Sequence, residues 1–392
     1  MFCKERPKSI SLKIFYPNYF TNRAISYACI SLAEAMNTQV FNVTVMGLSS
    51  IKSIDSSLYA NAIPHQLKRI AFHLFGNKLM KRFAEYRFRK TLKPGDVAYL
   101  WPGGSLSLYK EISKIKDVII VCEKVNTHDA YGKKLLDSEL SRLGMSCAQS
   151  ISDEKVKYEC ENNRYVSYFF SPSEIVSQSL RDNDISDDSI IDASYGVRKS
   201  EIVPDACSCN YGSDAEITAI FVGRIGIRKG VHLLLSAWQK ADIKGRLLLV
   251  GAIEENIKEL VNRHLSDNIQ HIPYTKDLSD IYCNADVFLL PSIEEGSPLV
   301  TYLALGAGLP SIVSPMGGGG IISSNEGYVI DPHDEDAWVD AIRRLAGNGD
   351  MRKSMGKYAK AKASEYTWDV VGERRAKSLA AKLQNSHWIT ES

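Results

Sequence analysis

The stretch EITAIFVGRIGIRKGVHLLLSAW, residues 216–238, decides the fold class of the second half of the chain. A β-rich run ends there in a glycine-containing loop that carries Arg224 and Lys229, and a helix-compatible segment follows. This order brings two cations and the free N–H groups of a helix start to the carboxyl end of a parallel strand, where open α/β sheets bind ligands. The stretch predicts an anion site, with a diphosphate as its natural guest; the alternative is a surface Arg and Lys beside a tight turn.

The same strand-then-helix order recurs along the whole chain. β-rich runs lie at 12–16, 40–47, 96–101, 117–123, 166–171 and 189–194 in the first half, and at 216–223, 245–251, 269–272, 286–292 and 310–313 in the second. The segments between them are long enough for crossover helices, which join parallel strands. We therefore expect an α/β protein with two doubly wound parallel-sheet domains.

Length and charge limit the functional classes. The chain has 392 residues, enough for two domains of roughly 100–200 residues each. Its 48 Lys and Arg against 46 Asp and Glu leave a net charge of +2, which argues against a protein that coats nucleic acid. The N-terminus lacks the apolar run of a secretory signal, and no apolar stretch approaches the ~20 residues that cross a bilayer. We expect a cytoplasmic protein with no nucleic-acid partner.

A segment without helical periodicity separates the two predicted domains. Residues 198–216 are rich in Pro, Gly, Ser and Asp, which is typical of an interdomain connection, and the boundary is expected near 205–214. We assign an N-terminal Rossmann-like domain to 1–208 and a C-terminal one to 209–366. Residues 367–392 are expected to form a terminal helix that packs back on the N-terminal domain.

A second loop with binding chemistry follows the strand at 286–292. Glu295 precedes Gly296 at a strand-to-helix junction, and Pro298 suits the first helical turn. Gly296 lets the backbone approach a ligand closely, and the turn from Ser297 to Leu299 can offer amides to phosphate oxygens. Glu295 can accept hydrogen bonds from sugar hydroxyls, although a Glu near a helix start is favourable for the helix dipole in any protein.

The ordered set FVGR, RKG, LLLVG, YCNADVFLLPS, EEGSPL and GAGLPSIVS resembles the nucleotide-sugar half of bacterial retaining glycosyltransferases of family 4 (glycosyl transferases group 1), which have the GT-B fold. The resemblance covers roughly 216–346 and implies two Rossmann-like domains that face each other across a cleft. It implies that Arg224 and Lys229 clamp the donor diphosphate and that Glu295 contacts the donor sugar. The residues expected to bind the nucleotide sugar are Gly223, Arg224, Lys229, Glu295, Gly296, Ser297, Pro298 and Leu299.

A weaker resemblance lies in the N-terminal half. The segment CEKVNTHDAYGKKLLDSEL, residues 122–140, is similar to the acceptor-side domain of a bacterial subgroup that carries an E-x-x-N-T-H segment. The subgroup places a His near the reacting sugar, which implies a catalytic role for His128. The alternative is a capping or solvent-facing histidine. Glu123 and Asn126 are expected to shape the same loop.

One position departs from the family pattern. A second glutamate usually follows the first by eight positions and holds the ribose hydroxyls, but this chain has Leu303 there. Leucine cannot accept a hydrogen bond. Either another group binds the ribose, or the protein is a non-catalytic GT-B partner or scaffold of another transferase. The run Gly317–Gly320 resembles the family's small-residue loop near the donor, or forms a flexible connection.

Residues 64–93 form a local basic segment. Nine Lys and Arg stand there against Glu85 alone, interleaved with Ile70, Phe72, Leu74, Phe75, Leu79, Phe83 and Phe88. Such a segment can dock on anionic lipid headgroups. The alternative is a solvated helix face that packs its aromatic residues inside.

Together these features predict a hexosyltransferase. We expect transfer from a nucleoside diphosphate sugar, linked to uridine or guanosine, to a saccharide or lipid-linked saccharide acceptor in bacterial cell-surface polysaccharide or glycan synthesis. The resemblance implies retention of anomeric configuration without a metal ion or other cofactor. If the basic segment binds lipid, the enzyme is peripheral at the inner face of the plasma membrane.

Overall fold

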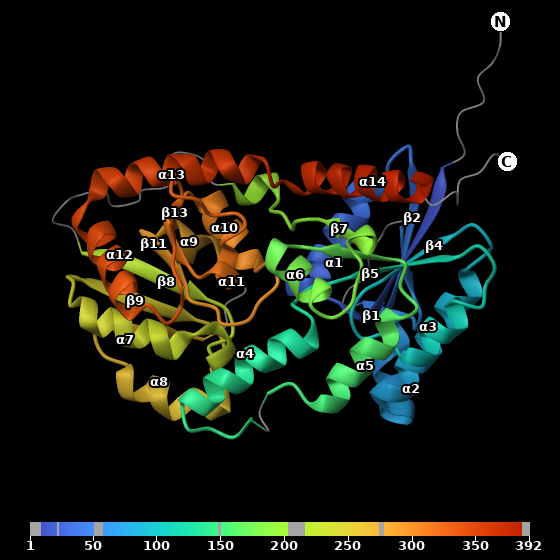
Figure 1. The fold of residues 1–392 in the computed structure, drawn as a ribbon, viewed down its shortest axis with the longest axis horizontal. Coiled ribbons are helices and arrows are strands. Elements are labelled where there is room, and N and C mark those ends of the chain that lie inside the picture. Colours follow the sequence, from blue (N-terminus) through green and yellow to red (C-terminus); the bar gives the residue numbers. More distant parts are fainter. Residues whose placement is uncertain are drawn as a thin grey trace, which may run out of the picture.

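The computed structural model describes residues 9–21, 23–50, 58–147, 150–202, 216–273 and 278–385. Two parallel sheets with flanking helices form two lobes that lie side by side (Figure 1). We call the part from residue 9 to residue 202 the N-lobe and the part from 216 to 364 the C-lobe. The boundary expected near 205–214 lies outside the described residues.

The N-lobe contains a seven-stranded sheet in the order β3-β2-β1-β4-β5-β6-β7, with every pairing parallel. Its central strands β4 and β5 are buried along their whole length, as expected for a sheet with helices on its faces. The strands are β1 (Ile10–Phe20), β2 (Phe41–Ser50), β3 (Tyr59–Asn61), β4 (Val97–Leu100), β5 (Ile119–Glu123), β6 (Tyr168–Ser171) and β7 (Ile190–Asp192).

The C-lobe contains a six-stranded parallel sheet in the order β10-β9-β8-β11-β12-β13. Its strand order reverses between β8 and β11, which makes the carboxyl ends of these two strands the expected ligand-binding crevice. The strands are β8 (Ile217–Val222), β9 (Gly245–Val250), β10 (Ile269–Ile272), β11 (Val287–Leu290), β12 (Ser311–Val313) and β13 (Gly327–Val329).

The helices connect these strands as crossovers. In the N-lobe they are α1 (Ala24–Met36), α2 (Lys68–Thr91), α3 (Leu106–Ile112), α4 (Asp129–Arg142), α5 (Asp153–Asn163) and α6 (Glu174–Arg181). In the C-lobe they are α7 (Val231–Ala241), α8 (Lys258–His264), α9 (Ser279–Cys283), α10 (Leu299–Ala307), α11 (Pro315–Gly318), α12 (Glu335–Gly347) and α13 (Gly349–Ser364), and α14 (Trp368–Asn385) follows. Short 3₁₀ turns lie at η1 (His65–Leu67), η3 (Asp187–Ser189), η4 (Lys199–Glu201), η5 (Ile227–Lys229) and η6 (Glu255–Ile257).

The predicted α/β architecture with two doubly wound parallel sheets is confirmed, and three strands differ in detail. The first strand continues past Tyr16 to Phe20, with a register shift between Tyr16 and Tyr19 that accommodates Pro17, which lacks an N–H for the ladder. The strands β3 and β13 were not predicted. Each is only three residues long and lies at a sheet edge, so its apolar pattern is too short to recognise.

The last helix leaves the C-lobe and packs on the N-lobe. In Figure 1, α13 and α14 run along the upper side of the molecule from the C-lobe to the N-lobe. The helix α14 lies against α1, where Trp368 donates its indole N–H to the Tyr27 hydroxyl at 2.8 Å. The Tyr27 hydroxyl in turn donates to Glu201 at 2.6 Å. The two lobes are therefore connected by a packed helix as well as by the chain segment before β8.

Candidate functional site

The loop after β8 forms the first part of the candidate site. Gly223 has φ +144°, and the 3₁₀ turn η5 carries Arg228 and Lys229 up to the start of α7. Gly230 caps α7 with φ +66°, and a Cβ there would come within 2.0 Å of the Pro291 carbonyl oxygen. Only glycine fits, and it lets the β8–α7 loop touch the loop after β11.

The two loops that follow β8 and β11 share a network of charged side chains. Lys229 forms an ion pair with Glu295, and Arg228 lies 3.4 Å from the same carboxylate. Arg228 also lies 2.7 Å from a Glu294 carboxylate oxygen. Lys229, Glu294 and Glu295 are largely buried, with side chains 16%, 3% and 13% exposed. The two predicted site residues Lys229 and Glu295 are thus in contact at the carboxyl edge of the C-lobe sheet.

Charge decides the protonation state of Glu295. Burial acts to raise the pKa of this carboxyl, but the nearby Lys229 and Arg228 outweigh burial and hold its pKa below the ordinary value. Glu295 is therefore ionised at neutral pH. It can accept hydrogen bonds from a polyol, and an anion that binds Lys229 must compete with it.

Arg224 follows β8 but is not one of the side chains joined in this network. Its side chain is 73% exposed, and its Nε lies 3.8 Å from the Glu254 carboxylate. An exposed guanidinium at this distance is held weakly. The structure therefore does not join Arg224 to Lys229, the residue with which it was predicted to bind the diphosphate.

The turn from Gly296 to Leu299 packs directly on the N-lobe. A Cβ on Gly296 would lie 2.1 Å from the Val125 carbonyl oxygen, and Ser173 donates its hydroxyl to the Gly296 carbonyl at 2.8 Å. Pro298 occupies the N-cap of α10, one position before the first helical turn in which it was expected. The Ser297 hydroxyl lies 2.9 Å from the Tyr302 hydroxyl, so it points into the protein.

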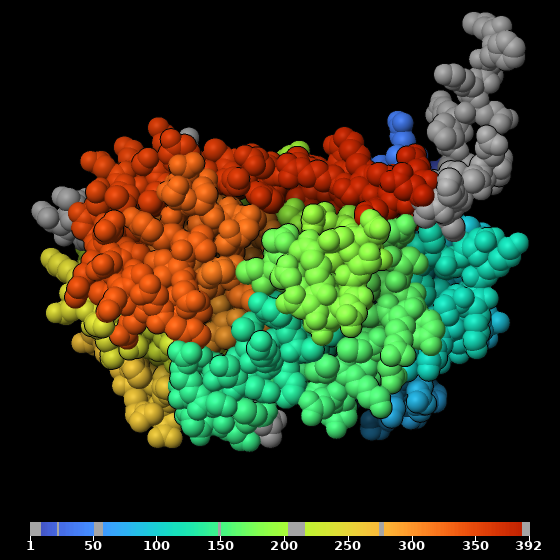
Figure 2. Space-filling view, viewed as in Figure 1, coloured from blue at the N-terminus to red at the C-terminus, as the bar shows by residue number. Residues whose placement is uncertain are grey.

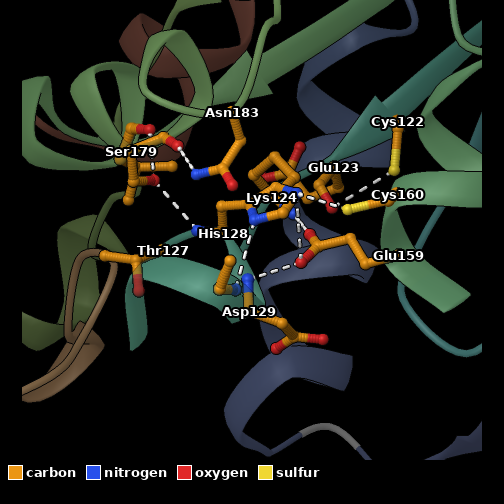
Figure 3. Close-up of polar contacts among 12 residues, drawn as sticks. Cys122, Glu123, Lys124, Thr127, His128, Asp129, Glu159, Cys160, Ser179 and Asn183 are labelled. Carbon is orange, nitrogen blue, oxygen red and sulfur yellow. Dashed lines mark hydrogen bonds and ion pairs between the residues drawn. The ribbon is translucent and has the colours of Figure 1, made fainter. Parts of the chain in front are cut away.

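His128 is buried in the N-lobe. Its side chain caps α4 by accepting from the Ala130 N–H at 3.2 Å, and its backbone N–H donates to the Ser179 hydroxyl at 2.9 Å. Figure 3 shows the ring among side chains that include Glu159, Cys160 and Ser179. Its Nε2 lies 3.7 Å from the Glu159 carboxylate and 3.9 Å from the Cys160 sulfur. The whole residue is only 1% exposed. The capping interpretation describes this geometry, whereas contact with a sugar requires the loop before α4 to move.

Burial also sets the charges around His128. Burial, with a smaller contribution from Lys124, lowers the pKa of His128 to about 4, so the imidazole is neutral at neutral pH. Lys124 is itself buried beside Glu159, and burial lowers its pKa. Figure 3 shows both side chains within the same contact network.

Glu123, which was expected to shape this loop, has its side-chain contacts in the interior of the N-lobe. It ends β5 and is 0% exposed, and its carboxylate accepts two hydrogen bonds from the Arg375 guanidinium at 2.8 and 3.2 Å. Tyr99 donates to the same carboxylate. The E-x-x-N-T-H segment is therefore anchored by a residue of α14.

Three residues of the network were not predicted as site residues: Arg228, Glu294 and Thr127. All three lie inside motifs quoted above, and the doubled acid before Gly296 was a visible signal. Thr127 donates its hydroxyl to Glu294 at 2.6 Å across the lobe boundary. Such a cross-lobe contact has no signal in local sequence.

Leu303 and the glycine run singled out in the sequence lie in and around the helices α10 and α11. Leu303 is half-buried and packs against the apolar core, so α10 presents no acceptor at this position. Gly317 and Gly318 are buried within α11, which Ser314 caps, and they do not form a flexible connection. Among the described residues, no group of three or more His, Cys, Asp or Glu could hold a metal ion.

The basic segment 64–93 forms η1 and the kinked helix α2. Phe88 is buried and stacks on Phe15, and Met80, Ala84 and Leu92 are buried as well, but the remaining large apolar side chains of the segment face outward. The interpretation in which the aromatic residues pack inside is therefore wrong for all but Phe88. Outward-facing residues include Ile70, Phe72, Leu74, Phe75, Leu79 and Phe83, each between 49% and 66% exposed. None of the described helices is long and apolar enough to cross a bilayer.

Comparison with protein families matches residues 211–362 to the family described as glycosyl transferases group 1. A D-inositol 3-phosphate glycosyltransferase of Corynebacterium urealyticum is 30% identical over 167 residues, which are 38% of this chain and 39% of that protein. The amylovoran biosynthesis glycosyltransferase AmsD of Erwinia amylovora is 21% identical over 303 residues, covering 74% of this chain and 78% of that protein. The chain thus spans about two fifths of the length of the first of these relatives.

Solved structures with the same fold cover almost the whole chain. Sucrose-phosphate synthase of Thermosynechococcus elongatus has a TM-score of 0.69 at 16% identity and covers 96% of this chain and 100% of its own. HepE of Anabaena, solved in complex with UDP and glucose, has a TM-score of 0.66 at 12% identity and covers 95% and 100%. With the two parallel sheets, these likenesses show the GT-B fold.

Proposed function

We propose that this protein is a glycosyltransferase that moves a hexose-type sugar from a nucleoside diphosphate to a saccharide or lipid-linked saccharide. One observation carries the proposal: cationic and acidic side chains converge at the carboxyl ends of β8 and β11, where the strand order of the C-lobe reverses. The match of residues 211–362 to glycosyl transferases group 1 supports it. The name of AmsD favours a role in polysaccharide or glycan synthesis. We propose that the product is a polysaccharide of the bacterial cell surface.

The chemistry of the site accounts for leaving-group departure. When the bond from the anomeric carbon to the diphosphate oxygen breaks, the electron pair remains on that oxygen. Lys229 and Arg224, with the N-terminus of α7, stabilise this charge without a metal ion. The acceptor oxygen bonds to the anomeric carbon from the same face, and its proton passes to the departing diphosphate. The configuration at that carbon is retained.

Donor binding must rearrange the ion pair between Lys229 and Glu295. Lys229 is engaged by Glu295, so a diphosphate binds Lys229 by replacing that carboxylate. The released Glu295 is then free to accept hydrogen bonds from hydroxyls of the donor sugar. We assign Lys229 and Arg224 to the diphosphate and Glu295 to the sugar. We assign Gly223 and the turn 296–299 to the same nucleotide-sugar site.

The proposal is tested by thermal shift and hydrolysis assays with uridine, guanosine and adenosine diphosphate sugars. We expect one donor, with a uridine or guanosine base, to raise the unfolding temperature and to be hydrolysed or transferred. Lys229→Ala and Arg224→Ala should each lower kcat/KM by roughly 100- to 1,000-fold with the circular dichroism spectrum unchanged. Activity should survive a chelator, and the product anomer should match the donor.

The same assays separate this proposal from its rival, a non-catalytic GT-B partner of another transferase. Leu303, in the place of an acceptor for ribose hydroxyls, favours the rival. A scaffold would neither bind nucleoside diphosphates nor hydrolyse any donor. Binding without turnover, or wild-type turnover by both Ala variants, would contradict the catalytic assignment.

We further propose that the outward face of α2 docks on an anionic membrane. The single acid of the segment, Glu85, points inward and accepts from the Ser105 N–H and hydroxyl at 2.7 and 2.6 Å, so the outer face is left basic. Leu79, Phe83 and Tyr86 form an exposed apolar stripe at helical spacing, flanked by cations such as Lys78 and Arg82. This would place a cytoplasmic enzyme at the inner face of the plasma membrane, near a lipid-linked acceptor.

A further inference from the structure

A continuous set of polar contacts runs from the proposed diphosphate site to the other lobe. Lys229 contacts Glu295, Arg228 lies between Glu295 and Glu294, and Glu294 accepts from Thr127. The first four residues belong to the C-lobe, and Thr127 follows β5 of the N-lobe. The set therefore crosses the boundary between the lobes.

Arg228 holds the loop after β11 with both its backbone and its side chain. Its carbonyl accepts from the N–H groups of Ile293 and Glu294 at 2.9 and 3.3 Å. Its guanidinium donates to the Glu294 carbonyl at 3.1 Å and reaches the carboxylates of Glu294 and Glu295. Any shift of Glu294 is thus transmitted to Glu295 through one rigid, planar group.

Glu294 is the member of the set that senses the N-lobe. It is 2% exposed and accepts from the Thr127 hydroxyl at 2.6 Å and from the Thr127 N–H at 3.3 Å. Figure 3 shows the Thr127 side chain at the edge of the His128 cluster, apart from the contacts that enclose the imidazole. A buried carboxylate is destabilised when it loses hydrogen-bond donors. If the lobes part, Glu294 loses both donors of Thr127 and keeps its ion pair with Arg228.

We propose that Glu294 is a positioning residue that couples lobe contact to the geometry of the donor site. This inference rests on the proposed function. With the lobes together, the Glu294 carboxylate accepts from Thr127 and also pairs with Arg228, and Arg228 keeps its contact with Glu295. With the lobes apart, Arg228 is drawn to Glu294, and Glu295 loses the contact with Arg228 that fixes its position. Sugar transfer from the donor is thereby favoured only when the N-lobe is in contact with the C-lobe.

The test compares Thr127→Val, which removes the hydroxyl at nearly constant volume, with Thr127→Ser, which restores it. Three quantities are measured: the radius of gyration by small-angle X-ray scattering, the Kd of the nucleoside diphosphate, and kcat for donor hydrolysis or transfer. We expect Thr127→Val to enlarge the radius of gyration and to lower kcat roughly 10-fold or more, because a hydrogen bond to a charged group is lost. The Kd should stay within about 2-fold, since the diphosphate contacts lie in the C-lobe.

Thr127→Ser should return the radius and kcat to wild-type values. Glu294→Gln should lower kcat at least as much as Thr127→Val, and the double variant should lose less than the product of the two losses, because both remove one contact. Unchanged radius and kcat in Thr127→Val would overturn the inference, as would a Kd that weakens in parallel with kcat. Failure of wild-type protein to bind any nucleoside diphosphate would instead overturn the proposed function, while the radius of gyration still reports on the cross-lobe contact.

Discussion

At the scale of single residues, burial decides which charges the site can use. His128 and Lys124 lie in the same buried network, and burial lowers the pKa of both. Glu295 is also buried, yet two neighbouring cations keep its carboxyl ionised. A neutral imidazole and an ionised carboxylate therefore stand on opposite sides of the lobe boundary.

The low pKa of His128 predicts a pH dependence of stability. Its pKa is about 4 in the folded protein and ordinarily 6.5, so the unfolded chain binds more protons between these values. The stabilising contribution is complete above pH 6.5 and is lost as the pH falls toward 4, by up to about 3 kcal/mol. Urea unfolding across this range measures it.

The matched control for this prediction is His128→Asn. Asparagine can still cap α4 but does not titrate in this range. The variant should lose less stability than wild type between pH 6.5 and 4. Equal losses in the two proteins would show that His128 is not the group responsible.

The positions of the site residues in the C-lobe loops could be predicted, because they depend only on the strand and loop pattern of the neighbouring sequence. Arg224, Lys229 and Glu295 lie in the loops that follow β8 and β11, and the edge they share follows from parallel topology alone. The environment of His128 could not be predicted, because Glu159 and Ser179 come from segments 31 and 51 positions further along the chain. Burial of the imidazole is a tertiary property.

At the scale of elements, α2 combines a buried and an exposed apolar face. Met80, Ala84 and Phe88 face the core at a spacing of four residues, while Leu79 and Phe83 face outward. Gly76, with φ +65°, kinks the helix and separates its first turns from the packed part. The apolar side chains of the first turns are therefore exposed and do not pack in the N-lobe core.

We expect this protein to sediment with vesicles that contain anionic lipid, at low salt but not at high salt. Lys78→Gln together with Arg82→Gln should weaken the partition roughly 30-fold, at about 1 kcal/mol per cation. Leu79→Ser with Phe83→Ser should weaken it further. Tyr358→Ser, at an exposed apolar position on α13, serves as the control and should have no effect. Binding of all variants alike, or none by wild type, would contradict the docking proposal.

The helix α14 contributes a buried cation to the N-lobe. Arg375 is 1% exposed and donates to both carboxylate oxygens of Glu123 and to the Ser194 carbonyl. The ring of Phe170 lies 4.9 Å from the guanidinium carbon. Removal of either charge leaves the other buried without its partner.

Arg375→Met should lower the free energy of unfolding by about 3–5 kcal/mol. The double variant Glu123→Gln with Arg375→Met should regain part of that loss, because no uncompensated charge remains. Urea unfolding of both variants provides the measurement. If the double variant is less stable than the single one, the pair is not the source of the effect.

At the scale of the whole molecule, the lobes also meet away from the proposed donor site. Glu139 of α4 is 2% exposed, with His232 Nε2 at 2.8 Å and His333 Nε2 at 2.6 Å, both from the C-lobe. Figure 2 shows the α4 region, in green to teal, directly against the yellow and orange surface of the C-lobe. Arg142 lies 3.7 Å from the same carboxylate. The two lobes therefore share a second polar contact.

Glu139→Gln should weaken this contact. Burial acts to raise the pKa of Glu139, but the two histidines outweigh it and lower the pKa to about 2. The contribution to stability is therefore complete above pH 4.5 and is lost as the pH falls toward 2. At pH 7 the variant should be less stable by about 1.5–3 kcal/mol in thermal or urea unfolding. The difference from wild type should shrink at pH 3, and a constant difference would contradict the prediction.

Contacts between the lobes mark the limit of what the sequence predicts. The two sheets followed from alternating strand and helix patterns within short windows. Pairs such as Thr127 with Glu294, or Glu139 with His232, join residues that are 167 and 93 positions apart. Their meeting depends on how two finished domains orient, and no periodicity encodes it.

The position of α14 has a consequence for the order in which the chain can fold. A ribosome that has just added Glu123 must add 252 more residues before Arg375 exists. At a synthesis rate of about 5–20 residues per second, Glu123 therefore lacks its ion-pair partner Arg375 for roughly 10–50 s. The N-lobe is therefore synthesised first, but its packing is completed only when α14 has been made.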